Sequence, residues 1–152
     1  MDKSYQRAVN EKIQSLSETI GRIKELSNIE PVWSEPKYID STHKGISGVV
    51  GVYRIIYKPT METMSIGQGN VGNRKDRHLQ VFRNDGKDKI APGGSTSGSV
   101  TAQKMYKHDT NLDNWFFSFC GVGEKILASE YENQLQIMEE PEFNNLNMGG
   151  NN

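Results

Sequence analysis

The sequence predicts an α/β (α+β) fold, in which a small three-stranded, mostly antiparallel sheet is flanked by helices and preceded by an extra N-terminal helix. Two observations predict the sheet: β-branched and aromatic residues are concentrated at 48–57 and at 115–121, and a short apolar segment follows the first of these after a turn. A third observation, helical spacing of apolar residues near the N-terminus, predicts the extra helix. A chain of 152 residues has room for one compact domain.

Residues 3–27 are predicted to form the N-terminal helix, because apolar side chains recur there at spacings of 4, 3, 4 and 3. The stripe consists of Val9, Ile13, Leu16, Ile20 and Ile23. So narrow a stripe suits a seam against one other helix. We expect it either to contact a second copy of the chain or to lie along the surface of the domain.

Residues 28–47 are predicted to be a connector, because they contain Pro31, Pro36 and Gly45 and few apolar residues. Within it, we expect Trp33 to anchor the connector to the core and His43 to lie on the surface. The chain therefore divides into an N-terminal helix with its connector (1–47), a main domain (48–147) and a short tail (148–152).

A hairpin opens the main domain. The strand at 48–57 alternates, so Tyr53 and Tyr57 share one face and Arg54 takes the other. Pro59 ends this strand, and a turn at 61–63 leads to a second strand at 64–67.

Helices and the third strand follow the hairpin. A helix is predicted from about residue 68 to Phe82, with Arg74 and His78 four residues apart and facing the same way. A long polar loop at 84–99 precedes a short helix at 100–108. Residues 115–121 are apolar on both faces and are predicted to form a central strand. A last helix at 124–140 ends before Pro141.

The charge of the chain is unevenly distributed although its net value is only −1. Residues 74–107 hold eight Lys or Arg against three acids, whereas residues 108–152 hold one Lys against eight acids. A basic segment of this kind contacts nucleic-acid phosphates or is a solvated charged face. The candidate DNA-binding residues are Arg77, Arg83, Lys87, Lys89, Lys104 and Lys107.

Six short motifs, in order along the chain, carry a family resemblance. They are Gly51-Val52-Tyr53, Ser65-Ile66-Gly67, Arg74, His78, Glu132 and Phe143-Asn144. In this order the motifs resemble the GIY-YIG nuclease family, over roughly residues 48–147. The family includes restriction enzymes, phage DNA-degrading nucleases and homing nucleases, so the resemblance implies a phosphodiester hydrolase that acts on DNA.

The resemblance also implies a role for each matched residue. Glu132 is the implied ligand of Mg²⁺ or Mn²⁺, Arg74 clamps the scissile phosphate, and Tyr53 activates the attacking water. His78 is implied as a proton partner or phosphate contact, and Asn144 as a residue that holds Glu132 and the C-terminal turn in place. Glu130 competes for the metal role, but the spacing of twelve residues to Asn144 favours Glu132.

Ser65 departs from the family, which has a second tyrosine at this position. Either Tyr57, on the same strand face as Tyr53, fills the space as a further catalytic residue, or the enzyme is slow or inactive. The leading hypothesis is thus a metal-dependent endonuclease of double-stranded DNA that forms a homodimer or higher homo-oligomer. The alternatives are a catalytically impaired nucleic-acid-binding module and a protein-interaction domain that works through the stripe of the N-terminal helix.

The expected location and cysteine chemistry follow from the apolar segments and the cysteine content of the sequence. No segment approaches the 18 apolar residues of a membrane span, and the N-terminus lacks the apolar core of a secretory signal, so we expect a cytoplasmic protein. The single cysteine, Cys120, cannot form an internal disulfide and is predicted to be a buried small hydrophobe.

Overall fold

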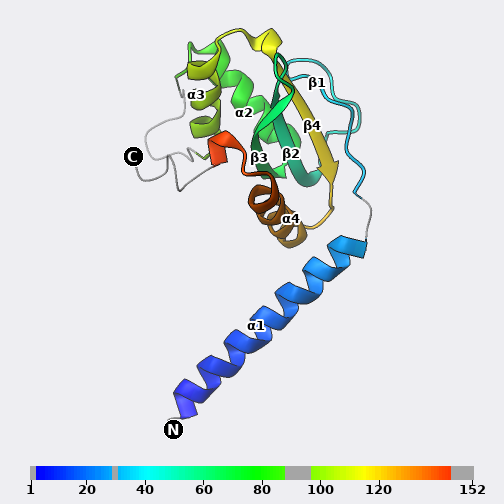
Figure 1. Cartoon of the computed structure of the whole chain (residues 1–152), viewed down its shortest axis with the longest axis vertical. Helices are drawn as coiled ribbons and strands as arrows, with labels where there is room; N and C mark the ends of the chain where they lie inside the picture. Colours follow the sequence, from blue (N-terminus) through cyan, green and yellow to red (C-terminus); the bar gives the residue numbers. More distant parts are fainter. Residues whose placement is uncertain (1–2, 29–30, 88–96, 145–152) are drawn as a thin grey trace.

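The computed structural model describes residues 3–28, 31–87 and 97–144 (Figure 1). Within these ranges the helices are α1 (Lys3–Asn28), α2 (Val71–Arg83), α3 (Ser97–His108) and α4 (Lys125–Glu139), with two short 3₁₀ turns, η1 (Leu112–Asn114) and η2 (Glu142–Asn144). The strands are β1 (Lys37–Tyr38), β2 (Val50–Tyr57), β3 (Glu62–Asn70) and β4 (Trp115–Gly121).

The strands form one sheet in the order β1-β4-β2-β3, and every pairing is antiparallel. The predicted central position of β4 is confirmed, since it lies between β1 and β2. The predicted number of strands is wrong, because Lys37 and Tyr38 of the connector pair with Phe117 and Phe116 and add a fourth. An edge pairing of two exposed residues leaves no alternating pattern in the sequence.

The hairpin of β2 and β3 is longer than predicted. Its register runs from Val50 opposite Asn70 to Tyr57 opposite Glu62, with an irregularity between Ile55 and Ile56. The second strand therefore continues through Gly69 to Asn70, where the sequence predicts the start of a helix. Helix α2 instead begins after Asn70, whose side chain accepts a hydrogen bond from the backbone N–H of Asn73 at 3.2 Å and caps the helix.

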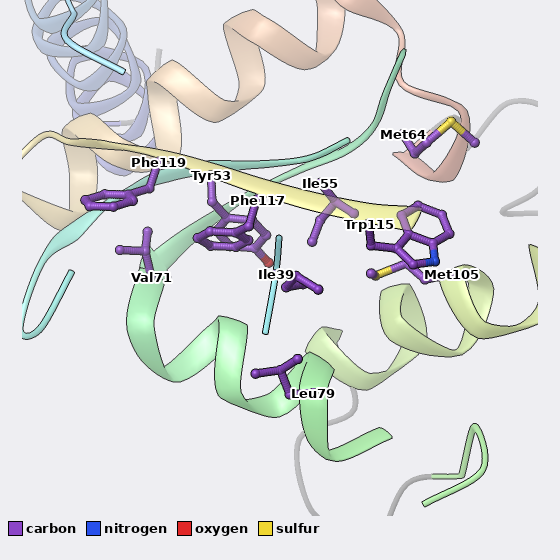
Figure 2. Close-up of a cluster of buried hydrophobic side chains, with 10 residues drawn as sticks. All are labelled: Ile39, Tyr53, Ile55, Met64, Val71, Leu79, Met105, Trp115, Phe117 and Phe119. Atoms are coloured by element: carbon purple, nitrogen blue, oxygen red, sulfur yellow. The ribbon is translucent and has the colours of Figure 1, made fainter. Parts of the chain in front are cut away.

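Two layers of helices cover the sheet. On one face, β2 and β4 pack against α2 and α3 through a cluster that includes Ile55, Leu79 and Met105 (Figure 2). On the other face, Val52 and Ile66 pack against Ala128 and Leu135 of α4. The predicted alternation of β2 is confirmed, and the sheet is enclosed on both sides.

The connector is more tightly packed than predicted. Trp33 packs at the edge of the α4 face and donates a hydrogen bond to the Tyr131 hydroxyl at 3.2 Å, as expected of an anchor. His43 is buried rather than on the surface, because Lys75 of α2 donates to its Nδ1 atom at 2.9 Å and its ring meets Phe117 edge-on. Cys120 is buried, as predicted.

Helix α1 extends away from the main domain and meets it near α4 (Figure 1). The predicted helix is confirmed, and much of its apolar stripe faces outward: Ile13, Leu16 and Ile20 are each more than half exposed. The side chain of Ile23 lies outside the described part of the chain. No described helix is both long and apolar enough to cross a membrane.

Candidate active site

One polar cavity of about 240 Å³ gathers side chains from both faces and the edge of the sheet. Residues widely separated in the sequence meet there, contributed by β2, β3, α2, α3, α4 and η2. The lining consists of Tyr53, Ser65, Ile66, Gly67, Gln68, Arg74, Thr101, Glu132 and Asn144. Four of the residues that the sequence singled out for catalysis, Tyr53, Arg74, Glu132 and Asn144, are therefore brought together.

Tyr53 is fixed in the wall of this cavity by its neighbours. Its ring stacks on Phe117 at 5.3 Å (Figure 2). The ring of His78 meets it edge-on at 5.8 Å. Burial raises the pKa of Tyr53 to about 12; Arg74 lowers it and Glu132 raises it further. A Cβ atom on Gly67, the residue opposite in β3, would lie 2.3 Å from the Tyr53 hydroxyl. Only glycine leaves room for this ring.

Arg74 lies in the first turn of α2, directly after the Asn70 cap. Gly69 has a φ of +125°, and a Cβ atom there would lie 3.2 Å from the Nε atom of Arg74. A side chain at position 69 would be strained and would crowd the guanidinium. The glycine at the end of β3 thus gives Arg74 its place beside Tyr53 and Glu132.

Glu132 supplies a carboxylate to the cavity from α4. Burial raises its pKa to about 7, and the nearby Arg74 opposes this shift. Of the two acids weighed for the metal role, the described lining includes Glu132 and not Glu130. The spacing argument that favoured Glu132 agrees with this geometry.

The cavity fits one kind of metal ion. No cluster of three or more His, Cys, Asp or Glu side chains occurs among the described residues, so they offer no ready-made cage for a metal such as zinc. Mg²⁺ and Mn²⁺ differ, because one carboxylate together with water and substrate phosphate completes their shell. Glu132 in a polar cavity is a donor set of that type.

The side chain of Asn144 binds the edge strand β3, and its predicted support of Glu132 stays a prediction. Its Oδ1 atom accepts a hydrogen bond from the backbone N–H of Ile66 at 2.7 Å. Gln136 of α4 donates to the carbonyl of the same residue at 3.0 Å. Both backbone groups of Ile66 on the edge strand β3 are thereby satisfied. Sequence reasoning missed Gln136, and no local pattern marks it.

His78 and Tyr57 do not reach the cavity. His78 is fully buried behind Tyr53, so a direct phosphate contact is wrong for this structure. Tyr57 packs on Trp115 at 5.0 Å and donates a hydrogen bond to Asp109 at 2.6 Å, and this bond raises its pKa. It does not fill the space left by Ser65, which is itself buried.

The candidate DNA-binding residues have different environments. Arg83, Lys87 and Lys107 are exposed. Lys104 donates to the carbonyl of Phe143 at 3.0 Å and so ties η2 to α3. Arg77 lines a second hollow beside the cavity. Lys89 lies outside the described residues.

Comparison with known proteins adds no relative. No protein-family model, curated protein or solved structure matches the chain. The structure itself shows a mixed α+β domain with an antiparallel four-stranded sheet. It also shows a cavity lined by a phenol, a guanidinium and a carboxylate.

Proposed function

We propose that this protein is a metal-dependent endonuclease of the GIY-YIG type that hydrolyses phosphodiester bonds of double-stranded DNA at the cavity described above. One observation carries the proposal: Tyr53, Arg74, Glu132 and Asn144 come from four different elements and line the same cavity. A chance resemblance of short motifs would give no reason for these four side chains to meet. Fold alone does not fix function, so the proposal rests on this site.

The residues divide the work of hydrolysis. Arg74 binds the scissile phosphate, because its planar fork of donors matches phosphate oxygens and keeps its charge at every relevant pH. Tyr53 holds the attacking water by its hydroxyl. A phenol whose pKa is raised to about 12 keeps its proton at neutral pH and in that form orients the water without taking its proton. Only the phenolate would accept the water's proton, and the nearby Arg74 charge favours that form.

Glu132 would hold Mg²⁺ or Mn²⁺ through its carboxylate. When bound, such a cation neutralises charge on the phosphate and on the leaving oxygen. Asn144 and Gln136 keep the edge of β3 in position, and β3 in turn presents Gly67 to Tyr53. His78 supports Tyr53 from behind rather than contacting substrate.

The proposed partners are double-stranded DNA and a second copy of the chain. Exposed cations at Arg83, Lys87 and Lys107 suit DNA phosphates. The outward stripe of α1 suits pairing with an identical helix, since its apolar side chains recur at coiled-coil spacing. Two catalytic cavities in one dimer would cut both strands of a duplex.

The second candidate is a nucleic-acid-binding module without catalysis. Ser65 is buried where the family has a tyrosine, and Tyr57 is held elsewhere by Asp109. This candidate predicts binding to DNA that weakens steeply with salt and no metal-dependent turnover.

Plasmid cleavage separates the two candidates. Supercoiled plasmid is incubated with the wild type in Mg²⁺, in Mn²⁺ and in EDTA, and with the variants Glu132→Gln and Glu130→Gln. The nuclease predicts nicking or linearisation that requires metal, is lost in Glu132→Gln and persists in the matched variant Glu130→Gln. Intact plasmid with every metal, together with salt-sensitive binding, would instead establish the binding module.

A further inference from the structure

A second hollow lies next to the candidate active site, on the outer side of α2. It measures about 590 Å³ and is lined by Asn70, Asn73, Arg74, Asp76, Arg77 and Gln80. Arg74 lines both this hollow and the catalytic cavity. A DNA strand whose phosphate binds Arg74 would therefore bring the neighbouring nucleotides over the hollow.

The hollow follows one stripe of the helix. Asn73, Arg77 and Gln80 are spaced by four and three residues and so share a face of α2. Asn73 and Gln80 are exposed, whereas Nε and Nη2 of Arg77 are buried. The opposite side of the helix, with Val71 and Leu79, is buried against the sheet. Packing of the buried side fixes which face α2 presents to a ligand.

The chemistry of the stripe suits base edges better than phosphates. Asparagine and glutamine form paired hydrogen bonds with adenine, arginine does so with guanine, and aspartate accepts from cytosine. Phosphate sites, in contrast, are rich in lysine and arginine and avoid carboxylates. Here Asp76 and several amides accompany the guanidinium groups, and no lysine lines the described hollow.

The dimensions agree with insertion into a groove. Helix α2 has 13 residues and is therefore ~20 Å long. The step from Arg74 to Gln80 spans ~9 Å of helix axis, which corresponds to two or three base pairs. An α-helix fits the major groove of DNA, which is ~12 Å wide.

We propose that α2 reads two or three base pairs of duplex DNA in the major groove beside the cleaved bond, with Asn73 and Gln80 as the reading residues. The inference deepens the proposed nuclease function and rests on it. It makes cleavage sequence-selective and assigns the selectivity to the same helix that carries the phosphate clamp, Arg74.

A binding selection tests this inference without requiring cleavage. Randomised duplexes are selected with the full chain carrying Glu132→Gln, alone and combined with Asn73→Ala and Gln80→Ala. The matched control adds Asn133→Ala, an exposed amide on α4. Thermal melting checks that each variant is folded. We expect a preference at two or three adjacent positions, a drop in discrimination of at least about tenfold in the Asn73→Ala and Gln80→Ala protein, and none in the control.

The other outcomes overturn the inference. Three of them are selection without any base preference, a preference that survives the two substitutions, and failure of the protein to retain duplex DNA. The fourth is a loss of DNA affinity that is equal for all sequences and comes with a smaller salt dependence, which would mark a phosphate contact. Failure of the proposed function is distinguishable: a wild type that cuts without preference keeps the nuclease and removes the readout. A wild type that binds selected sequences but does not cut DNA keeps the readout and removes the nuclease.

Discussion

The carboxyl group of Glu132 illustrates how burial tunes a single residue in this site. Its pKa is raised to about 7 by burial, and the Arg74 charge offsets only part of that effect. An acid whose pKa is higher in the folded than in the unfolded state favours folding when protonated. Its contribution is therefore fully present below the unfolded value of 4.5 and is lost as pH rises toward 7.

We predict that Glu132→Gln stabilises the metal-free protein at pH 8 and has little effect at pH 4. The amide resembles the protonated acid and removes the cost of an ionised carboxylate, which is on the order of 1–3 kcal/mol. Urea unfolding in EDTA at pH 4, 6 and 8 measures the difference, with Glu130→Gln as the matched charge change. A difference between wild type and Glu132→Gln that does not grow with pH would show that burial does not control this carboxyl group.

Individual residues also show what the sequence could and could not predict. The family resemblance singled out Tyr53, Arg74 and Glu132, and the structure brings these three side chains to one cavity. The prediction that Tyr57 fills the space beside Ser65 is wrong, because alternation fixes the face on which a side chain lies but not its position along the strand. Tyr53 and Tyr57 are four residues apart, which is ~13 Å of strand.

Helix positions carry the same ambiguity. Arg74 and His78 are one helical turn apart, yet one lines the cavity and the other is buried. The long side chain of an arginine can reach from the flank of a helix to solvent, whereas a histidine ring cannot. Spacing alone does not distinguish these two outcomes.

Among the elements, β3 and η2 depend on one another. Ile66 on the edge strand is bonded through its N–H to Asn144 and through its carbonyl to Gln136. An edge strand without such partners exposes backbone groups to other chains. The C-terminal helix and turn therefore close the edge of the sheet next to the cavity.

We expect Asn144→Ala to lower the free energy of unfolding by about 1–3 kcal/mol, because the amide of Ile66 loses its acceptor in a partly buried position. Asn144→Asp keeps an oxygen there and should lose less. Chemical denaturation provides the comparison, and amide exchange at Ile66 provides a local readout. Equal stability of Asn144→Ala and wild type would mean that the turn does not hold β3.

Predictability of the elements followed the strength of their patterns. The strands rich in β-branched and aromatic residues were predicted, and so was α1 from its apolar spacing. Strand β1 was missed because two exposed residues have no periodicity. The end of β3 was misplaced because a glycine such as Gly69 is unfavourable inside a strand, whereas the close approach of Arg74 explains its presence there.

The whole molecule consists of a compact domain and an outlying helix. Burying a large aliphatic side chain is worth ~1.5–3 kcal/mol, and α1 leaves Ile13, Leu16 and Ile20 more than half exposed. An isolated helix in water is only marginally stable, so a partner surface along this stripe would stabilise it.

We predict that the protein is a dimer in solution and that Ile13→Glu combined with Leu16→Glu makes it monomeric. Both side chains are exposed on α1, so the main domain should keep its thermal stability. Sedimentation velocity at micromolar concentrations measures the state, and Gln14→Glu, on the polar side of the same helix, serves as control. A monomeric wild type, or a dimer that survives the double substitution, would assign the stripe another role.

The most direct test of the catalytic cavity is the single-turnover cleavage rate of Tyr53→Phe, measured in Mg²⁺ beside Tyr57→Phe and the wild type. The phenylalanine keeps the ring between Phe117 and His78 and removes only the hydroxyl. We predict a loss of at least about 100-fold for Tyr53→Phe, typical of a group that acts on the attacking water, with unchanged DNA binding. Tyr57→Phe should remain close to wild type. A Tyr53→Phe enzyme that cuts within about threefold of the wild-type rate would contradict the proposed site.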